Sequence, residues 1–417
     1  MNDMSRKVLF VTYGGGHVQL VISLLPFLES CKIDYRIFAL TTAQRDLEHA
    51  GYSFSRCADY LPARNYDDAL LRGAELSRLF WNQHSAVSWH ESCAYMGVSM
   101  LDLIADKGEI EAKSCFQREG RSAFCPVSFM LQVLEREKPC LVVVTCLARM
   151  EKAAVIAAKR LGVKSVLIED LFAYSLLGRY CSDTPPVLVP PEVWPDSVVV
   201  MNQKLADLVR SAGFPPHAVH PLGQPLFAQW LRGLKAPSEG SAMQKSLASE
   251  APQCIAYATP AVHDVALRHS LAIRELAEAF GQAKFCIKLH PSLAIAEVSS
   301  RLAPLPQNLT IVADVDNIEI IKSSSLFIIF NSTLGVLALL ACVPLIVFDD
   351  SGAPEVLPYV SSGAAVGARS ANELKAIVAE HLNADSRSSS RFVHPLFENS
   401  PQAGEHIAAW LQEQLAR

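Results

Sequence analysis

Short apolar runs alternate with stretches of helical spacing through most of the chain. In the first half, five apolar runs predict β-strands: residues 7–12, 34–40, 138–146, 164–170 and 197–202. After the first run, apolar residues recur every three or four positions, as at Val18, Val21 and Leu25, which predicts a helix. Apolar strands that alternate with helices predict βαβ units and a parallel sheet.

The same alternation begins again in the second half. The runs that predict strands there are residues 254–259, 284–290, 308–314, 326–331 and 343–349. Residues 233–253, between the two halves, are rich in Ser, Ala, Gly and Pro and predict a linker. The predicted fold class is α/β, with two Rossmann-like parallel-sheet domains and a cleft between them.

The length of 417 residues favours two hydrophobic cores over one. We expect an N-terminal domain at residues 1–232, which contains a mostly helical insert at about 60–135. The C-terminal domain is expected at residues 254–395. Residues 396–417 include an amphipathic helix, which we expect to pack back towards the N-terminal domain.

One apolar stretch is long enough to span a bilayer. Residues 326–348 carry no charge over 23 positions. Asn331, Ser332 and Thr333 interrupt the stretch, and Pro344 lies near its end. We therefore interpret it as strand, turn, helix and strand in a buried α/β core, with a transmembrane helix as the minor alternative.

Charge and cysteine usage narrow the class of protein. The net charge is only −5, without a long block of one sign, so we predict no nucleic-acid partner. The eleven cysteines form no C-x-x-C pair and have no zinc spacing. Without a recognisable secretory signal, they predict reduced thiols of a cytoplasmic protein. Peripheral association with the inner face of the membrane is left open.

The first predicted strand leads into a glycine-rich turn before the first helix. Gly14, Gly15 and Gly16 would allow a ligand to approach the backbone, and a helix N-terminus attracts anions. His17 could bind an anion or serve as a base. The pattern is not G-x-G-x-x-G, so NAD is disfavoured. The alternative is a tight turn with a solvent-facing histidine.

Two further strand ends carry polar residues in the second half. A strand ends in His290 and Pro291, with Lys288 two residues before the histidine, and the proline would fix the turn that holds the imidazole. Another strand ends in Asn331, Ser332 and Thr333, with Gly335 in the next helix. Ser332 and Thr333 could cap that helix or bind an anion. Plain capping and an incidental histidine are the alternatives.

Two Rossmann-like domains with "GGGH" in the first resemble the GT-B glycosyltransferases and the related nucleotide-sugar 2-epimerases. The "HP" and "NST" stretches are similar to a narrower group of bacterial polysialyltransferases, capsule Kdo transferases and teichoic-acid glycerophosphotransferases. This resemblance implies that His290, Ser332 and Thr333 bind the phosphate of a cytidine nucleotide. It also implies a CMP-activated donor, such as a nonulosonic or Kdo-like sugar, and a glycan or glycolipid acceptor in capsule or surface polysaccharide biosynthesis.

The chain departs from this pattern at one position. Many GT-B proteins carry a ribose-binding glutamate after the Ser-Thr pair, where this chain has Leu337. Asp349, Asp350 and Glu355 follow the next strand and are candidate replacements.

The candidate catalytic residues lie at strand ends of the first half. A transferase needs a base for the acceptor hydroxyl, and His17, Glu169 and Asp170 are the candidates. Arg149 could hold an anionic group or be a solvated helix residue. We expect no cofactor and no metal, because helix-end N–H groups and basic side chains can neutralise a leaving phosphate.

Three functions remain open at this stage. The leading one is a metal-independent glycosyltransferase that uses a nucleotide-sugar donor. The second is a nucleotide-sugar 2-epimerase or hydrolase on the same fold, and the third is a non-catalytic protein that binds sugar nucleotides. An oxidoreductase is the weakest reading, because no dinucleotide fingerprint is present.

Overall fold

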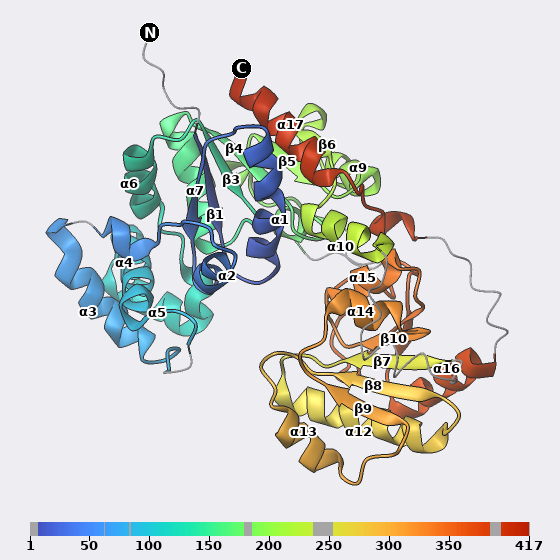
Figure 1. Cartoon of the computed structure of the whole chain (residues 1–417). Coiled ribbons are helices and arrows are strands. Elements are labelled where there is room, and N and C mark those ends of the chain that lie inside the picture. Colours follow the sequence, from blue (N-terminus) through green and yellow to red (C-terminus); the bar gives the residue numbers. More distant parts are fainter. Residues whose placement is uncertain are drawn as a thin grey trace. The chain divides into compact units, whose positions relative to one another are not determined.

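The computed structural model describes residues 7–61, 63–82, 85–178, 186–236, 253–383 and 393–416 (Figure 1). The chain divides into two compact units, one of Met1–Ala228 with Asn399–Arg417 and the other of Gln229–Glu398. Most of the predicted linker, residues 237–252, lies outside the described residues. Its first residues, Gly233–Lys235, are the end of helix α10 (Pro225–Lys235).

The first unit contains a six-stranded parallel sheet in the order β2-β1-β3-β4-β5-β6. Its strands are β1 (Val8–Thr12), β2 (Tyr35–Ala39), β3 (Leu141–Val144), β4 (Lys164–Ile168), β5 (Ser197–Val200) and β6 (Val219–Pro221). β1 and β3 are buried at every position, which explains why all their residues except Thr12 are apolar. The strand order reverses between β1 and β3, and ligands of such sheets bind where the order reverses, at the carboxyl ends.

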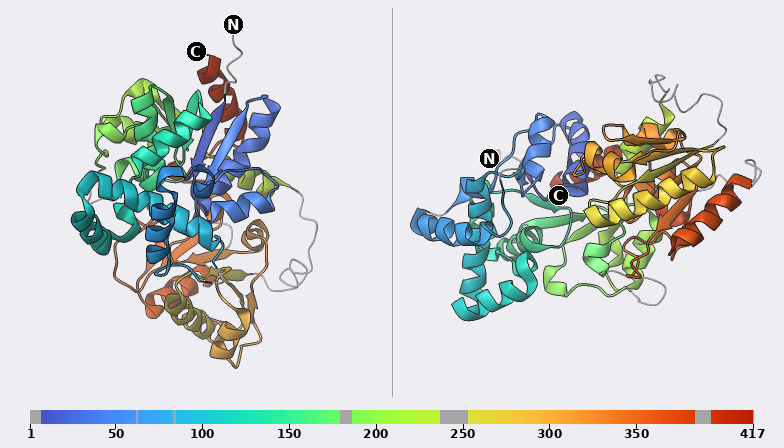
Figure 2. Two further views of the ribbon diagram at one scale, coloured as in Figure 1. Left: turned by 90° about the vertical axis from the view of Figure 1, so that its left-hand side faces the viewer. Right: turned by 90° about the horizontal axis from the view of Figure 1, so that it is seen from below.

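Helices flank this sheet (Figure 2). They are α1 (Gly16–Ser30), α2 (Ala43–His49), α3 (Tyr66–Ser77), α4 (Trp89–Lys107), α5 (Glu109–Glu119), α6 (Val127–Glu137), α7 (Arg149–Leu161), α8 (Tyr174–Leu177), α9 (Gln203–Ser211) and α17 (Ala403–Ala416). Short 3-10 helices are η1 (Cys57–Tyr60), η2 (Ala63–Asn65), η3 (Gly120–Ala123), η4 (Pro191–Val193) and η5 (Pro216–Ala218). Helices α3 to α6 occupy most of the segment predicted as a helical insert.

The C-terminal helix α17 is part of the first unit, although the whole second unit separates it from the rest in sequence. It packs on α1, and Ile407 and Leu411 share a core with Val18 and Leu25. Gly404 permits this contact, because a Cβ there would lie 2.3 Å from the ring of Phe27.

The second unit contains another six-stranded parallel sheet, in the order β12-β11-β10-β7-β8-β9. Its strands are β7 (Cys254–Ala258), β8 (Lys284–Lys288), β9 (Leu309–Val312), β10 (Leu326–Ile329), β11 (Leu345–Phe348) and β12 (Val366–Ala368). Its helices are α12 (His263–Ala279), α13 (Ile295–Leu302), α14 (Asn317–Lys322), α15 (Leu334–Leu340), α16 (Ala371–Asn383) and the short η6 (Pro395–Phe397). This is the Rossmann strand order, which reverses between β7 and β10.

The structure confirms the predicted α/β class with two Rossmann-like parallel sheets. It also confirms the interpretation of residues 326–348, which form β10, a turn, α15 and β11. Among the described residues, none of the helices combines the length and the apolar character needed to cross a bilayer. Strands β6 and β12 were not predicted.

Candidate functional site

The three glycines after β1 differ in what the backbone requires of them. A Cβ on Gly14 would lie 1.8 Å from Oγ1 of Thr42, so only glycine fits beside the loop that follows β2. Gly15 precedes α1 with a φ of 71°, a conformation that glycine adopts readily. Gly15 and Gly16 are exposed, and space around their Cβ positions is open. No side chain at these two positions therefore covers the start of α1.

His17, in the first turn of α1, lies beside Asp170, which follows β4. The Nδ1 atom of His17 is 3.4 Å from Oδ2 of Asp170, and the two side chains are 26% and 18% exposed. This nitrogen is buried and makes no hydrogen bond with the described residues, so the contact is electrostatic. Burial raises the pKa of Asp170, and the charge of His17 opposes that shift. The fold thus brings two of the three predicted catalytic residues together.

A chain of polar contacts holds the backbone of Asp170. The side chain of Gln224 donates from Nε2 to the carbonyl oxygen of Asp170 over 3.0 Å. Gln224 is itself fixed by Asn399, whose Oδ1 accepts from the Gln224 N–H at 2.7 Å. Asn399 belongs to the segment that returns to the first unit, so this segment supports the position of Asp170.

Glu169, the third predicted catalytic residue, faces inward. Its side chain is 2% exposed, and Oε1 accepts hydrogen bonds from the N–H and the hydroxyl of Ser175. Its Oε2 has no hydrogen-bond partner among the described residues. Burial, with the charge of Asp170 as a second cause, raises the pKa of Glu169 from 4.5 to about 8. The geometry therefore favours Asp170 over Glu169 as the carboxylate that acts with His17.

Glu151, in the first turn of α7, is a site residue that the sequence analysis missed. It is fully buried and accepts hydrogen bonds from the Tyr13 N–H (3.1 Å), the Cys146 N–H (2.8 Å), and both the N–H and the hydroxyl of Thr145. These donors belong to the loops after β1 and β3, at the point where the strand order reverses. Glu151 thus ties together the two loops that carry His17 and the start of α7. An acidic residue in a first helical turn after a strand was the available signal.

His17, Cys146 and Glu151 together form a cluster of metal-ligand types, with ligand atoms within 4.8 Å of one another. Four hydrogen bonds already occupy the two oxygens of Glu151. Burial, with the charge of Glu151 as the second cause, raises the pKa of the Cys146 thiol well above its usual value. Donors of the protein thus already engage Glu151, and metal-independent catalysis stays a prediction.

In the second unit, the residues after β8 fix His290 in one tautomer. The His290 N–H donates to the hydroxyl of Thr259, which follows β7, over 2.7 Å. Its Nδ1 accepts from the Ser292 N–H at 3.2 Å, which leaves Nε2 as the ring nitrogen that carries the proton. Burial, and then the charge of Lys288, lower the pKa of His290. The neutral imidazole is therefore held as a hydrogen-bond donor. Pro291 is exposed next to it.

The polar residues after β10 lie at the same edge of this sheet, because β10 and β8 both pair with β7. Asn331 and Thr333 are exposed. The hydroxyl of Ser332 accepts from the Leu334 N–H at 3.2 Å, just before α15, and Thr333 is the N-cap residue of that helix. Gly335 is buried, and a Cβ there would lie 2.7 Å from the ring of Tyr359, so the structure gives it a packing role.

Lys288 and the acidic residues after β9 also lie at this edge. Lys288 is only 9% exposed, and burial lowers its pKa against the opposing charges of Asp316 and Asp314. Asp314 and Asp316 form an Asp-x-Asp stretch after a strand that the sequence analysis missed. Asp316 is the N-cap of α14, where Oδ1 accepts from the N–H groups of Ile318 and Glu319.

The candidate replacements for a ribose-binding glutamate are all engaged within the unit. Leu337 itself is fully buried in α15. Asp350 accepts two hydrogen bonds from Arg268 and lies 2.9 Å from Nε2 of His269. The carboxylates of Asp349 and Glu355 accept from nearby loop residues in the same way.

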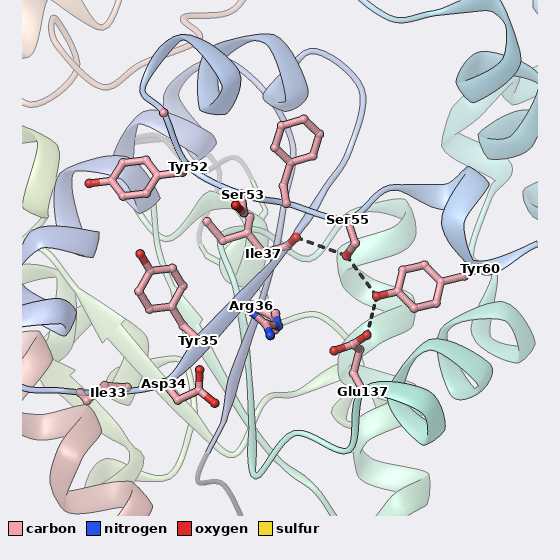
Figure 3. A pocket seen from close by; sticks show the side chains of 12 residues that line it. Ile33, Asp34, Tyr35, Arg36, Ile37, Tyr52, Ser53, Ser55, Tyr60 and Glu137 are labelled. Carbon is pink, nitrogen blue, oxygen red and sulfur yellow. Dashed lines mark hydrogen bonds between the residues drawn. The ribbon is translucent and has the colours of Figure 1, made fainter.

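A separate hollow of about 620 Å³ lies along the edge strand β2 (Figure 3). Tyr60 lines it and donates to Oε1 of Glu137 at 2.7 Å, and its hydroxyl lies 3.1 Å from that of Ser55. The hollow extends from Ile33 and Asp34, at the amino end of β2, and contains none of the predicted site residues. It therefore lies apart from the carboxyl ends where those residues gather.

Solved structures with the same arrangement of strands and helices span almost the whole chain. The S. aureus protein MnaA, determined with UDP, has 14% identity and a TM-score of 0.63, covering 98% of this chain and 97% of its own. The UDP-GlcNAc 2-epimerase of Neisseria meningitidis, bound to UDP-GlcNAc, has 14% identity and a TM-score of 0.60, covering 98% and 100%. The glycotransferase of kitacinnamycin has 12% identity and a TM-score of 0.58, covering 98% and 99%.

The chain has a GT-B fold. The predicted resemblance to GT-B glycosyltransferases and 2-epimerases is confirmed at the level of the fold. No protein-family model matches the chain, and no curated protein matches it. The chain therefore shares its fold with these proteins, whereas the chemistry of its site depends on the residues described above.

Proposed function

We propose that this GT-B protein is a glycosyltransferase that moves a sugar from a nucleotide-activated donor to a hydroxyl group of a glycan or glycolipid. The observation that carries the proposal is the pair of His17 and Asp170. A histidine oriented by a carboxylate at the mouth of a glycine-rich turn is suited to deprotonate an acceptor hydroxyl.

In this mechanism, the buried Nδ1 of His17 faces Asp170, and the other ring nitrogen takes the proton. The imidazole removes the proton as the acceptor oxygen attacks the anomeric carbon of the donor. The bond from that carbon to the phosphate oxygen breaks, and its electron pair leaves with the phosphate. Asp170 stabilises the imidazolium that forms, because opposite charges at 3.4 Å attract in a partly buried site.

The second unit is proposed to bind the phosphates of the donor. The Nε2–H of His290 and the exposed polar groups of Asn331 and Thr333 are the proposed donors at the carboxyl edge of its sheet. Lys288 would supply positive charge for the leaving phosphate. Pro291 and Ser332 shape the two turns that carry these groups.

Two classes of nucleotide are candidates for the donor. A CMP-linked nonulosonic or Kdo-like sugar follows from the "HP" and "NST" motifs. A UDP-sugar is suggested instead by the structures of this fold that were determined with UDP or UDP-GlcNAc. Both classes belong in the first binding screen, in which a nucleotide at a hundredfold excess over its Kd should stabilise the protein by about 2.7 kcal/mol.

A 2-epimerase or hydrolase is the second candidate function. Structures described as UDP-GlcNAc 2-epimerases match the chain over almost its full length, and this favours the alternative. Such an enzyme needs only the sugar nucleotide, whereas a transferase needs an acceptor. A binding protein without catalysis is the third candidate, because no glutamate stands at the position of Leu337.

Product analysis by NMR separates these functions. The protein is incubated with UDP-GlcNAc and with a CMP-sugar, each with and without a panel of surface glycans. Transfer that depends on acceptor supports the proposal, whereas an epimer or free sugar formed without acceptor refutes it. His17→Ala should abolish turnover with little change in nucleotide affinity, and His290→Ala should weaken nucleotide binding. His217→Ala, at an exposed position, is the matched control.

A further inference from the structure

A second hollow of about 620 Å³ lies in the first unit, at the carboxyl end of β3. It is lined by the loop residues Leu147 and Ala148, the start of α7 with Arg149 and Lys152, and Arg121 and Ser122 of η3. Three of the six lining residues are cationic and none is acidic. The hollow therefore has the character of an anion-binding site.

The three cations are not neutralised within the described part of the chain. None of Arg121, Arg149 and Lys152 lies within 4.0 Å of a carboxylate there, although Arg121 lies 5.1 Å from the ring centre of Phe80. Other arginines of the protein are paired, such as Arg72 with Asp68 at 2.8 Å. Unpaired positive charge that converges on one hollow is available for a ligand.

Arg149 is held in place by its surroundings. Its guanidinium lies 4.2 Å from the ring centre of Tyr13, and its backbone has a φ of 48°, in the left-handed region. The hydroxyl of Tyr13 lies 2.9 Å from that of Tyr95 and accepts from the Met150 N–H. A non-glycine residue kept in a sparsely populated conformation at a hollow is typical of a functional position.

Most backbone N–H groups in the first turn of α7 are already engaged, so side chains are the main hydrogen-bond donors of this hollow. The Met150 N–H donates to Tyr13, and the N–H groups of Glu151 and Lys152 donate to the carbonyl oxygen of Ala148. Few backbone donors at the start of α7 are then left for a ligand. The two guanidinium groups and the ammonium group become the decisive contacts, and guanidinium groups suit phosphate and carboxylate oxygens.

We propose that this hollow binds a phosphate or carboxylate group of the acceptor substrate. It opens at the carboxyl end of β3, and β3 pairs with β1, the strand that leads to His17. The assignment to the acceptor rests on the proposed transferase function, whereas the anion site itself is inferred from the hollow alone. A phosphate group of the nucleotide-sugar donor is the alternative ligand for the same hollow.

Binding of inorganic phosphate, measured by calorimetry on the full chain, tests the anion site. The background carries His290→Ala and Thr333→Ala, which removes two of the proposed phosphate contacts in the second unit. Arg121→Gln and Lys152→Gln should each weaken phosphate binding about tenfold or more. Arg160→Gln, an exposed position near the end of the same helix, is the matched control and should leave the affinity unchanged. Equal affinities in all these proteins, or no phosphate binding at all, would overturn the proposal.

Nucleotide affinity of the single variants, with the second unit intact, tests the source of the anion. If the hollow serves the acceptor, Arg121→Gln and Lys152→Gln should bind UDP and CMP as the unaltered protein does. A tenfold loss of nucleotide affinity would overturn the acceptor assignment. The phosphate titration needs no turnover, so failure of the transferase proposal would leave that result standing and the two failures are distinguishable.

Discussion

Replacement of Glu169 by glutamine tests whether this buried carboxyl group keeps its proton in the folded protein. Glutamine retains an oxygen for the contacts with Ser175 but carries no charge at any pH. Because burial raises the pKa of Glu169 from 4.5 to about 8, the native protein holds a proton that the unfolded chain has lost between these values. The free energy of unfolding must then fall as the pH rises through this window.

The size of the effect follows from the same shift. Between about pH 6 and about pH 8, ionisation of this one group in the unfolded chain lowers the free energy of unfolding by roughly 2 kcal/mol. Glu169→Gln has no carboxyl group to ionise at this position, so the free energy of unfolding of the variant should depend less on pH. Between the two pH values, the difference in unfolding free energy between the variant and the unaltered protein should shift by ~2 kcal/mol in favour of the variant.

Urea unfolding at the two pH values, followed through hydrogen exchange of peptides from β4, measures the stability of the first unit. Glu135→Gln, at an exposed position of α6, is the matched control and should follow the unaltered protein. If Glu169→Gln shows the same pH dependence as the unaltered protein, Glu169 is ionised in the native state and burial does not raise its pKa.

Three other substitutions test separate parts of the structure. Gly15→Val should abolish turnover and leave nucleotide affinity intact, because a β-branched residue cannot easily adopt a φ of 71°; calorimetry and a product assay separate the two effects. Glu151→Ala should lower the free energy of unfolding of the first unit by about 3 kcal/mol or more, since it leaves buried donors unpaired; urea denaturation measures this, and a loss under 1 kcal/mol would contradict it. Gly335→Ala should destabilise the second unit by about 1–3 kcal/mol through the clash with Tyr359, visible as faster hydrogen exchange in β10 peptides.

The long apolar runs predicted most of the two sheets, because a strand buried on both faces needs apolar residues at every position. Strands β6 (Val219–Pro221) and β12 (Val366–Ala368) escaped prediction for the opposite reason. Each has three residues at the edge of a sheet, and only one of the three is buried in either strand. A run this short carries no period that distinguishes it from a loop.

Only those residues of the candidate site that lie at or shortly after the end of a predicted strand could be identified from the sequence. His17, Asp170 and His290 were found because polar residues follow apolar runs. The sequence could not show that Glu169 faces inward, since neighbouring residues after a strand point in different directions. The role of Glu151 depends on hydrogen bonds to Tyr13 and Cys146, and this long-range contact is created by the pairing of β1 with β3.

The return of Asn399 and α17 to the first unit has a consequence for the order of assembly during synthesis. A ribosome produces Gln229–Glu398, the whole second unit, before the segment that braces Gln224 and covers α1 exists. The second unit is one continuous stretch and can fold before α17 is synthesised. Until then, the first unit exposes Val18 and Leu25, which α17 later covers. The first unit, although made first, is completed last. A nascent chain therefore passes through a stage with an open apolar surface, and chaperones that bind such surfaces are expected to engage it until α17 arrives.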